Sequence, residues 1–219
     1  MFVYADNAAT TAMNKAAIDA MLPAMSDVYG NPSSLHQKGR EANYALMDAR
    51  RRVAACLGAE AREIYFTGCG TEADNWAITE AARLGAAQGK KHIISDTIEH
   101  HAVLHTLAKL EKQGFEVTYL PVHEEGVIRM EELEAAIRPD TCLVTIMYVN
   151  NEIGTVQPIR QIGKLCREKG ILPSPSMSLS RIAVTWAIFS LRWLQLSSRA
   201  AAIARMAGIA SVPPRLPRS

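Results

Sequence analysis

A glycine-rich turn followed by a helix start occupies residues 66–75, FTGCGTEADN. Gly68 and Gly70 let the backbone approach an anion closely, and Thr71 adds a hydroxyl donor. The first turn of a helix also supplies unpaired N–H groups and the positive end of the helix dipole. We therefore predict that Gly70 and Thr71 bind a phosphate group. An ordinary capped helix start would use the same residue types, and that alternative stays open here.

A histidine stands beside a second helix start, in the segment IEHHAVLH at residues 98–105. The neutral imidazole of His100 could stack on a planar ring or transfer protons near neutral pH. A surface histidine beside a helix cap is the alternative. The residue type therefore predicts either a catalytic ring contact or a local structural role.

Two amides and a carboxylate gather in VNNEIG, residues 149–154. An asparagine side chain can hydrogen-bond a hydroxyl of a ligand ring without adding charge. An Asx turn that closes the preceding strand is the alternative reading of the same residues. The segment therefore predicts a polar ligand contact or a turn.

The elements that must position these motifs alternate along the chain. Apolar residues at three-to-four spacing predict helices, while short β-branched and aromatic runs predict strands. The alternation indicates an α/β fold with a mostly parallel sheet covered by helices, and the most apolar run, 142–149, is predicted to be a central strand buried on both faces. The predicted helices cover 14–25, 41–58, 68–85, 101–114, 130–137 and 159–170, and the predicted strands cover 63–67, 92–95, 115–120 and 142–149.

Each polar motif follows one of these strands, after Thr67, Ser95 and Val149. In open parallel sheets, ligands lie at the carboxyl ends of the strands. We therefore expect the three motifs to gather at one edge of the sheet.

Five motifs together resemble the cysteine desulfurases of the NifS/IscS type. These enzymes belong to the class V branch of the fold-type I pyridoxal-phosphate (PLP) enzymes. The resemblance covers residues 2 to about 172, and it is carried by DNAATT (6–11), GNPSSLHQKG (30–39), FTGCGTEADN (66–75), IEHHAVL (98–104) and VNNEIGTVQPI (149–159).

The resemblance implies a fold, a reaction and a site. The fold is the PLP-transferase-like large domain, an α/β/α arrangement, here incomplete. The reaction converts L-cysteine to L-alanine and leaves a persulfide for iron–sulfur cluster assembly or thio-modification. Gly70 and Thr71 would hold the cofactor phosphate, Asn151 would bond the ring oxygen, and His100 would stack on the ring and take part in proton transfer. Gly68 departs from the family, which often has serine there.

The resemblance also names groups that the family requires after residue 172. A lysine holds the cofactor aldehyde as a Schiff base, an aspartate pairs with the pyridinium nitrogen, and a mobile cysteine accepts the sulfur. Lys169 is the last lysine of this sequence, Cys166 is the last cysteine, and no aspartate follows Leu172. We therefore expect a truncated desulfurase large domain over 1–172 that is inactive alone and does not bind the cofactor covalently.

A non-homologous tail is expected over residues 173–219. Residues 1–168 hold 17 basic and 22 acidic side chains, 17 − 22 = −5, whereas residues 169–219 hold 7 basic and none acidic, +7. We interpret the tail as out-of-frame translation. A basic, tryptophan-containing segment for a membrane or nucleic-acid surface is the alternative.

Other function classes are less well supported by the sequence. Four cysteines without a CxxC pair predict no metal site, and the absence of a secretory signal and of a membrane-length apolar run predicts a cytoplasmic protein without membrane or nucleic-acid partners. The family implies a homodimer that meets scaffold or sulfur-acceptor proteins. The alternatives are another class V enzyme, such as a selenocysteine lyase or an aminotransferase, and a non-catalytic fragment that pairs with a full-length subunit.

Overall fold

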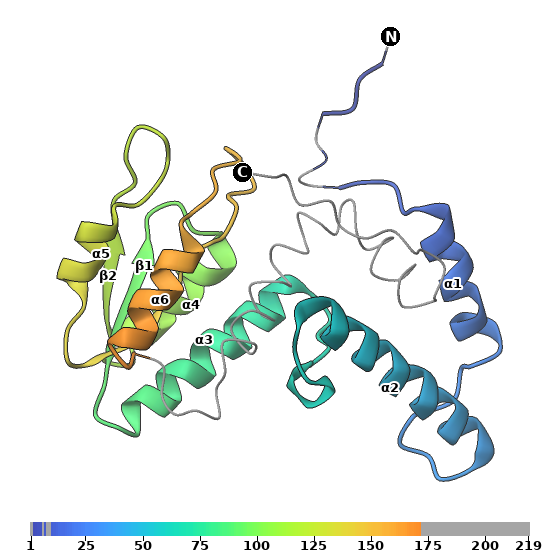
Figure 1. Cartoon of the computed structure of the whole chain (residues 1–219). Coiled ribbons are helices and arrows are strands. Elements are labelled where there is room, and N and C mark those ends of the chain that lie inside the picture. The colour runs from blue at the N-terminus through green and yellow to red at the C-terminus, as the bar shows by residue number, and fades with distance from the viewer. Residues whose placement is uncertain (1, 6, 8–9, 172–219) are drawn as a thin grey trace. The chain divides into compact units, whose positions relative to one another are not determined.

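The computed structural model describes residues 2–5, 7 and 10–171, which form two compact units divided along the chain between Tyr65 and Phe66 (Figure 1). The tail predicted over 173–219 lies outside the described residues. No helix among the described residues is long and apolar enough to cross a membrane. The two units are described separately below.

The first unit consists of helices α1 (Lys15–Ser26) and α2 (Gln37–Leu57) and the short 3₁₀ helix η1 (Ala61–Glu63). Asn14 caps α1 by accepting a hydrogen bond from Ala16 N at 2.8 Å. Gly58 ends α2 with φ 65°, the left-handed conformation that favours glycine at this position, so the helix ends where the predicted helix 41–58 does.

The second unit is built on a parallel sheet of three described strands in the order β2-β1-β3. The strands are β1 (His92–Asp96), β2 (Glu116–Leu120) and β3 (Thr141–Val144). The helices are α3 (Gly70–Ala86), α4 (His101–Glu111), α5 (Met130–Ala136) and α6 (Ile159–Glu168). The alternation confirms the predicted α/β class, because each parallel pair needs a crossover between its strands.

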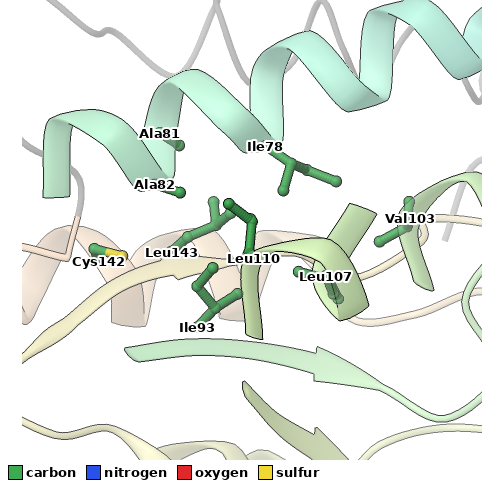
Figure 2. Close-up of a cluster of buried hydrophobic side chains, with 9 residues drawn as sticks. All are labelled: Ile78, Ala81, Ala82, Ile93, Val103, Leu107, Leu110, Cys142 and Leu143. Carbon is green, nitrogen blue, oxygen red and sulfur yellow. The ribbon is translucent and has the colours of Figure 1, made fainter. Parts of the chain in front are cut away.

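Apolar clusters cover both faces of the sheet. Ile93 and Ile94 are both fully buried, and successive strand side chains point to opposite faces. Ile93 joins residues of α3 and α4 in one cluster (Figure 2), and Ile94 joins residues of α5 and α6 in the other. The unit is therefore a three-layer α/β/α arrangement.

Helix α3 approaches the sheet closely at Gly85. A Cβ atom at this position would lie 2.3 Å from Cys142 Cβ on β3, well inside van der Waals contact. Glycine is therefore required at residue 85 by packing rather than by backbone conformation.

His92 links the three strands at the amino end of the sheet. Its Nδ1 lies 2.7 Å from the Thr141 hydroxyl on β3, and its Nε2 lies 2.8 Å from the Thr118 hydroxyl on β2. Burial lowers the pKa of His92, and the charge of Arg138 adds to this effect. The neutral His92 ring therefore stabilises the sheet at the amino ends of the strands, away from the predicted site at their carboxyl ends.

Two predictions about the strands are wrong. The predicted strand 63–67 is absent: Glu63 ends η1, and residues 64–67 pair with no described strand. Ile64 O accepts a hydrogen bond from the Arg50 guanidinium instead. The segment 142–149 is not central in the described sheet, where β1 lies in the middle. Its burial on both faces is confirmed from Cys142 to Val144, where the strand ends, since an apolar run reports burial rather than position in the sheet.

Candidate functional site

The N-terminus of α3 has the features of an anion cradle. Gly70 is buried as the first helical residue, and Cys69 before it makes no side-chain capping bond. The Thr71 side chain is exposed, and its hydroxyl bonds to no described residue. The first-turn amides and this hydroxyl are therefore available to an anion.

The preceding turn is ordered by a carboxylate. Gly68 N donates to Glu72 Oε2 at 2.7 Å, so the side chain of Glu72 folds back over the turn. A Cβ atom at Gly68 would lie 3.2 Å from that same oxygen, which is the far end of a flexible side chain. A serine at this position would therefore need only a small shift, and the departure from the family pattern is structurally minor.

His100 caps helix α4. It lies just before the helix in an extended conformation, and its Nδ1 accepts a hydrogen bond from Ala102 N at 3.1 Å. The side chain is half-buried. Because Nδ1 is an acceptor in this cap, proton exchange with a ligand must use Nε2. His100 is therefore the N-cap of α4. This cap bond leaves Nε2 as the ring nitrogen that could exchange a proton with a ligand.

The two asparagines after β3 have different surroundings. Asn150 is buried, and its Oδ1 accepts from Glu152 N at 2.8 Å and from Ile153 N at 3.0 Å, which makes the Asx turn. The side chain of Asn151 is half-buried and makes no hydrogen bond to any described residue. The first asparagine is therefore structural, and the second keeps its hydrogen-bonding groups for a ligand.

Buried carboxyl groups at the end of β1 were not anticipated from the sequence. Asp96 is fully buried, and burial raises its pKa to about 6. Burial, reinforced by the charge of Asp96, raises the pKa of Glu99 well above its usual range. The buried Ser95 Oγ and Asp96 Oδ2 have no partner among the described residues. Four polar residues in ISDTIE, at the end of an otherwise apolar strand and just after it, were the available signal.

Hydrogen bonds join the elements that carry the predicted residues. Asn150 Nδ2 donates to Ile98 O at 2.9 Å, which connects the turn before Asn151 to the loop before His100. Asn75, one turn into α3, contacts Thr106 of α4. The three motifs therefore belong to segments that are tied to one another.

The residues present fit part of a pyridoxal-phosphate site. The uncapped end of α3 with the Thr71 hydroxyl suits a phosphate, the His100 ring suits an aromatic face, and the Asn151 amide suits a ring hydroxyl. The loops 68–69, 97–100 and 150–158 contain no lysine, so these loops cannot bind the aldehyde covalently.

Residues 3–174 match the family model described as aminotransferase class-V. The match covers well over half of the chain, so the chain belongs to this family of PLP-dependent transferases. The predicted family and the fold class are confirmed.

Two similar curated proteins carry the name of one enzyme. "Cysteine desulfurase IscS" of Methanosarcina thermophila is 54% identical over 169 residues, which is 77% of this chain and 42% of the relative. The protein of the same name from Clostridium botulinum (strain Hall) is 50% identical over the same shares. The chain thus spans about two fifths of the length of these relatives.

Solved structures agree in fold. A structure titled "NIFS-like protein" superposes with a TM-score of 0.74 at 43% identity, covering 77% of this chain and 46% of that chain. A second, titled "SspA in complex with cysteine", has a TM-score of 0.72 at 42% identity and covers 78% and 49%.

Proposed function

We propose that residues 1–172 are the cofactor-binding part of a cysteine desulfurase large domain. The observation that carries the proposal is the presence of three groups on connected segments: the uncapped first turn of α3, the half-buried His100 ring and the Asn151 amide. These groups match a phosphate, an aromatic face and a ring hydroxyl. The relatives' names favour a desulfurase over a selenocysteine lyase or another aminotransferase.

Each residue has a distinct role in this proposal. Gly70 N–H and the Thr71 hydroxyl bind the phosphate, helped by the positive end of the α3 dipole. Asn151 donates to or accepts from the ring oxygen. His100 lies against the ring, held by its cap bond at Nδ1, and exchanges protons through Nε2.

The bound cofactor would supply an electron sink for bond cleavage at the amino acid. L-cysteine as substrate, with alanine and an enzyme persulfide as products, is a proposal for the whole protein, supported by the relatives' names. A homodimer, scaffold or sulfur-acceptor partners and a cytoplasmic location are further proposals that rest on the family resemblance alone. The 219-residue chain has no lysine in the three loops, so we propose reversible binding of PLP without covalent attachment there.

Equilibrium dialysis of the full chain against PLP tests the cradle. Thr71→Val removes one hydrogen bond to a charged group, and we expect PLP to bind about tenfold more weakly. Thr79→Val is the matched control, because Thr79 is exposed further along α3. Borohydride reduction should yield no stoichiometric pyridoxyl-lysine.

Equal PLP affinities for the two threonine variants would reject the cradle. A single modified lysine, together with alanine release from cysteine, would overturn the expectation of non-covalent binding.

A further inference from the structure

The proposed site depends on the spacing of three separate segments. Thr71 begins α3, His100 begins α4, and Asn151 lies in the turn after β3. A rigid cofactor requires its phosphate and ring contacts at a defined separation, and a misplacement of about 1 Å can cost about 100-fold in activity. Two asparagines that are not assigned to ligand contact connect these segments.

Asn150 connects the second and third segments. Its Nδ2 donates to Ile98 O at 2.9 Å, two residues before His100, while its Oδ1 accepts from Glu152 N and Ile153 N in the turn around Asn151. The side chain is 5% exposed, so water competes little for these bonds. One amide therefore spans both ring-contact segments.

A buried carboxyl group reinforces this connection. Glu99 Oε2 accepts from His100 N at 3.0 Å, and the backbone N–H of Met147, beyond β3, also bonds to this carboxyl. Glu99 is 7% exposed. The loop before α4 is thus fastened to the segment after β3 at two places.

Asn75 connects the first and second segments. Its amide is assigned the orientation in which both of its polar atoms are satisfied, with the nitrogen toward two carbonyl oxygens. In that orientation it donates to Ala102 O at 3.0 Å and to Thr71 O at 3.2 Å, and it also contacts the Thr106 hydroxyl. The opposite orientation would place the amide oxygen against these carbonyls. One amide therefore joins the first turn of α3 to the first turn of α4.

We infer that Asn75 and Asn150 are positioning residues that set the distance between the phosphate cradle and the ring contacts. Asn75 fixes Thr71 relative to the start of α4, and Asn150 fixes the start of α4 relative to Asn151. The ligand in this inference rests on the proposed function, whereas the fastening of the segments is a property of the chain alone.

Asn75→Asp and Asn150→Asp test the inference. A carboxylate has the same shape, but it has no hydrogen to donate to the carbonyl oxygens, while a carboxylate in place of the Asn150 amide would still accept the two turn bonds. Gln157→Glu is the matched control. Gln157 is 3% exposed, and its amide also joins two backbone groups, Gly126 O and Ile128 N, which lie between β2 and α5 rather than in the three site segments. If an aspartate variant does not fold, the serine variant at the same position, Asn75→Ser or Asn150→Ser, is measured in its place.

Hydrogen exchange of the full chain without cofactor measures the fastening. We expect amides of residues 97–103 to exchange about tenfold faster in both asparagine variants than in wild type or in Gln157→Glu, because one connecting hydrogen bond is lost. Exchange equal to that of the control would overturn the inference.

Binding measures the consequence for the site. PLP should bind about tenfold more weakly to both variants, while inorganic phosphate, which needs only the cradle, should bind within about twofold of wild type. Unchanged PLP affinity alongside faster exchange would overturn the positioning role. Failure of wild type to bind PLP would reject the proposed function. The hydrogen-exchange result would then test only whether Asn75 and Asn150 hold the three segments together.

Discussion

His100 has an observed role as a helix cap and a proposed role in ligand contact, and a sequence motif cannot separate the two. Its Nδ1 caps α4 by accepting from Ala102 N at 3.1 Å, and this bond orients the ring. The cap and the proposed ring contact therefore depend on one side chain. A substitution that removes the imidazole but keeps the cap can distinguish them.

His100→Asn is such a substitution. Asparagine is a strong N-cap residue, so the free energy of unfolding should change by less than about 0.5 kcal/mol, whereas His100→Ala should cost about 1 kcal/mol. Both variants should bind PLP more weakly, by about tenfold, because the stacking surface is lost. Urea unfolding and equilibrium dialysis measure the two effects. PLP binding by His100→Asn equal to wild type would show that His100 is only a cap.

At the scale of elements, the packing of α3 on β3 outweighs the helix propensity of residue 85. Alanine is better than glycine in a helix interior by about 1 kcal/mol. Residue 85, however, faces Cys142 so closely that an added Cβ would lie 2.3 Å from Cys142 Cβ. Cys142 belongs to a buried cluster that also contains Ile78 and Ala82 of α3 (Figure 2), so the helix cannot move away from β3 without opening that cluster.

Gly85→Ala should therefore destabilise the second unit by about 1–3 kcal/mol, the usual cost of overpacking. The urea midpoint, followed by circular dichroism, should fall. An unchanged or raised midpoint would contradict the close approach of α3 and β3.

At the scale of the whole second unit, buried ionisable groups make stability depend on pH in opposite directions. The pKa of Asp96 is raised by burial from 3.8 to about 6, so the fold prefers its protonated form. Stability from this group is greatest below its unfolded pKa and is lost as pH rises through about 6. The pKa of His92 is lowered, so its contribution is lost as pH falls below the unfolded value.

Asp96→Asn removes the ionisation of Asp96, together with its charge effect on Glu99, while His92 titrates in both proteins. The stability of the variant relative to wild type should increase by up to about 3 kcal/mol between about pH 4 and about pH 8. Urea unfolding at several pH values measures this difference. A difference that stays constant with pH would show that Asp96 ionises normally in the fold.

Local patterns predicted most elements of this chain, because they depend on neighbouring residues. The spacing of apolar residues located the helices, Gly58 marked the end of α2, and turn glycines with Thr71 marked the start of α3. Strand 63–67 was wrong because a strand also needs a partner, and no local pattern reports whether one is present. The place of β1 in the sheet was missed for the same reason.

The sequence by itself determined the family, the α/β class and the identity of the candidate contacts Gly70, Thr71, His100 and Asn151, since motif residues and periodicity are properties of the chain. Only the tertiary structure decided that Asn150 rather than Asn151 makes the turn, that His100 uses Nδ1 for its cap, and that Asn75 and Asn150 join the three segments. These features arise from hydrogen bonds that form only when the chain is folded, several of them between residues distant in the sequence. The burial that raises the pKa of Asp96 likewise exists only once the helices cover the sheet.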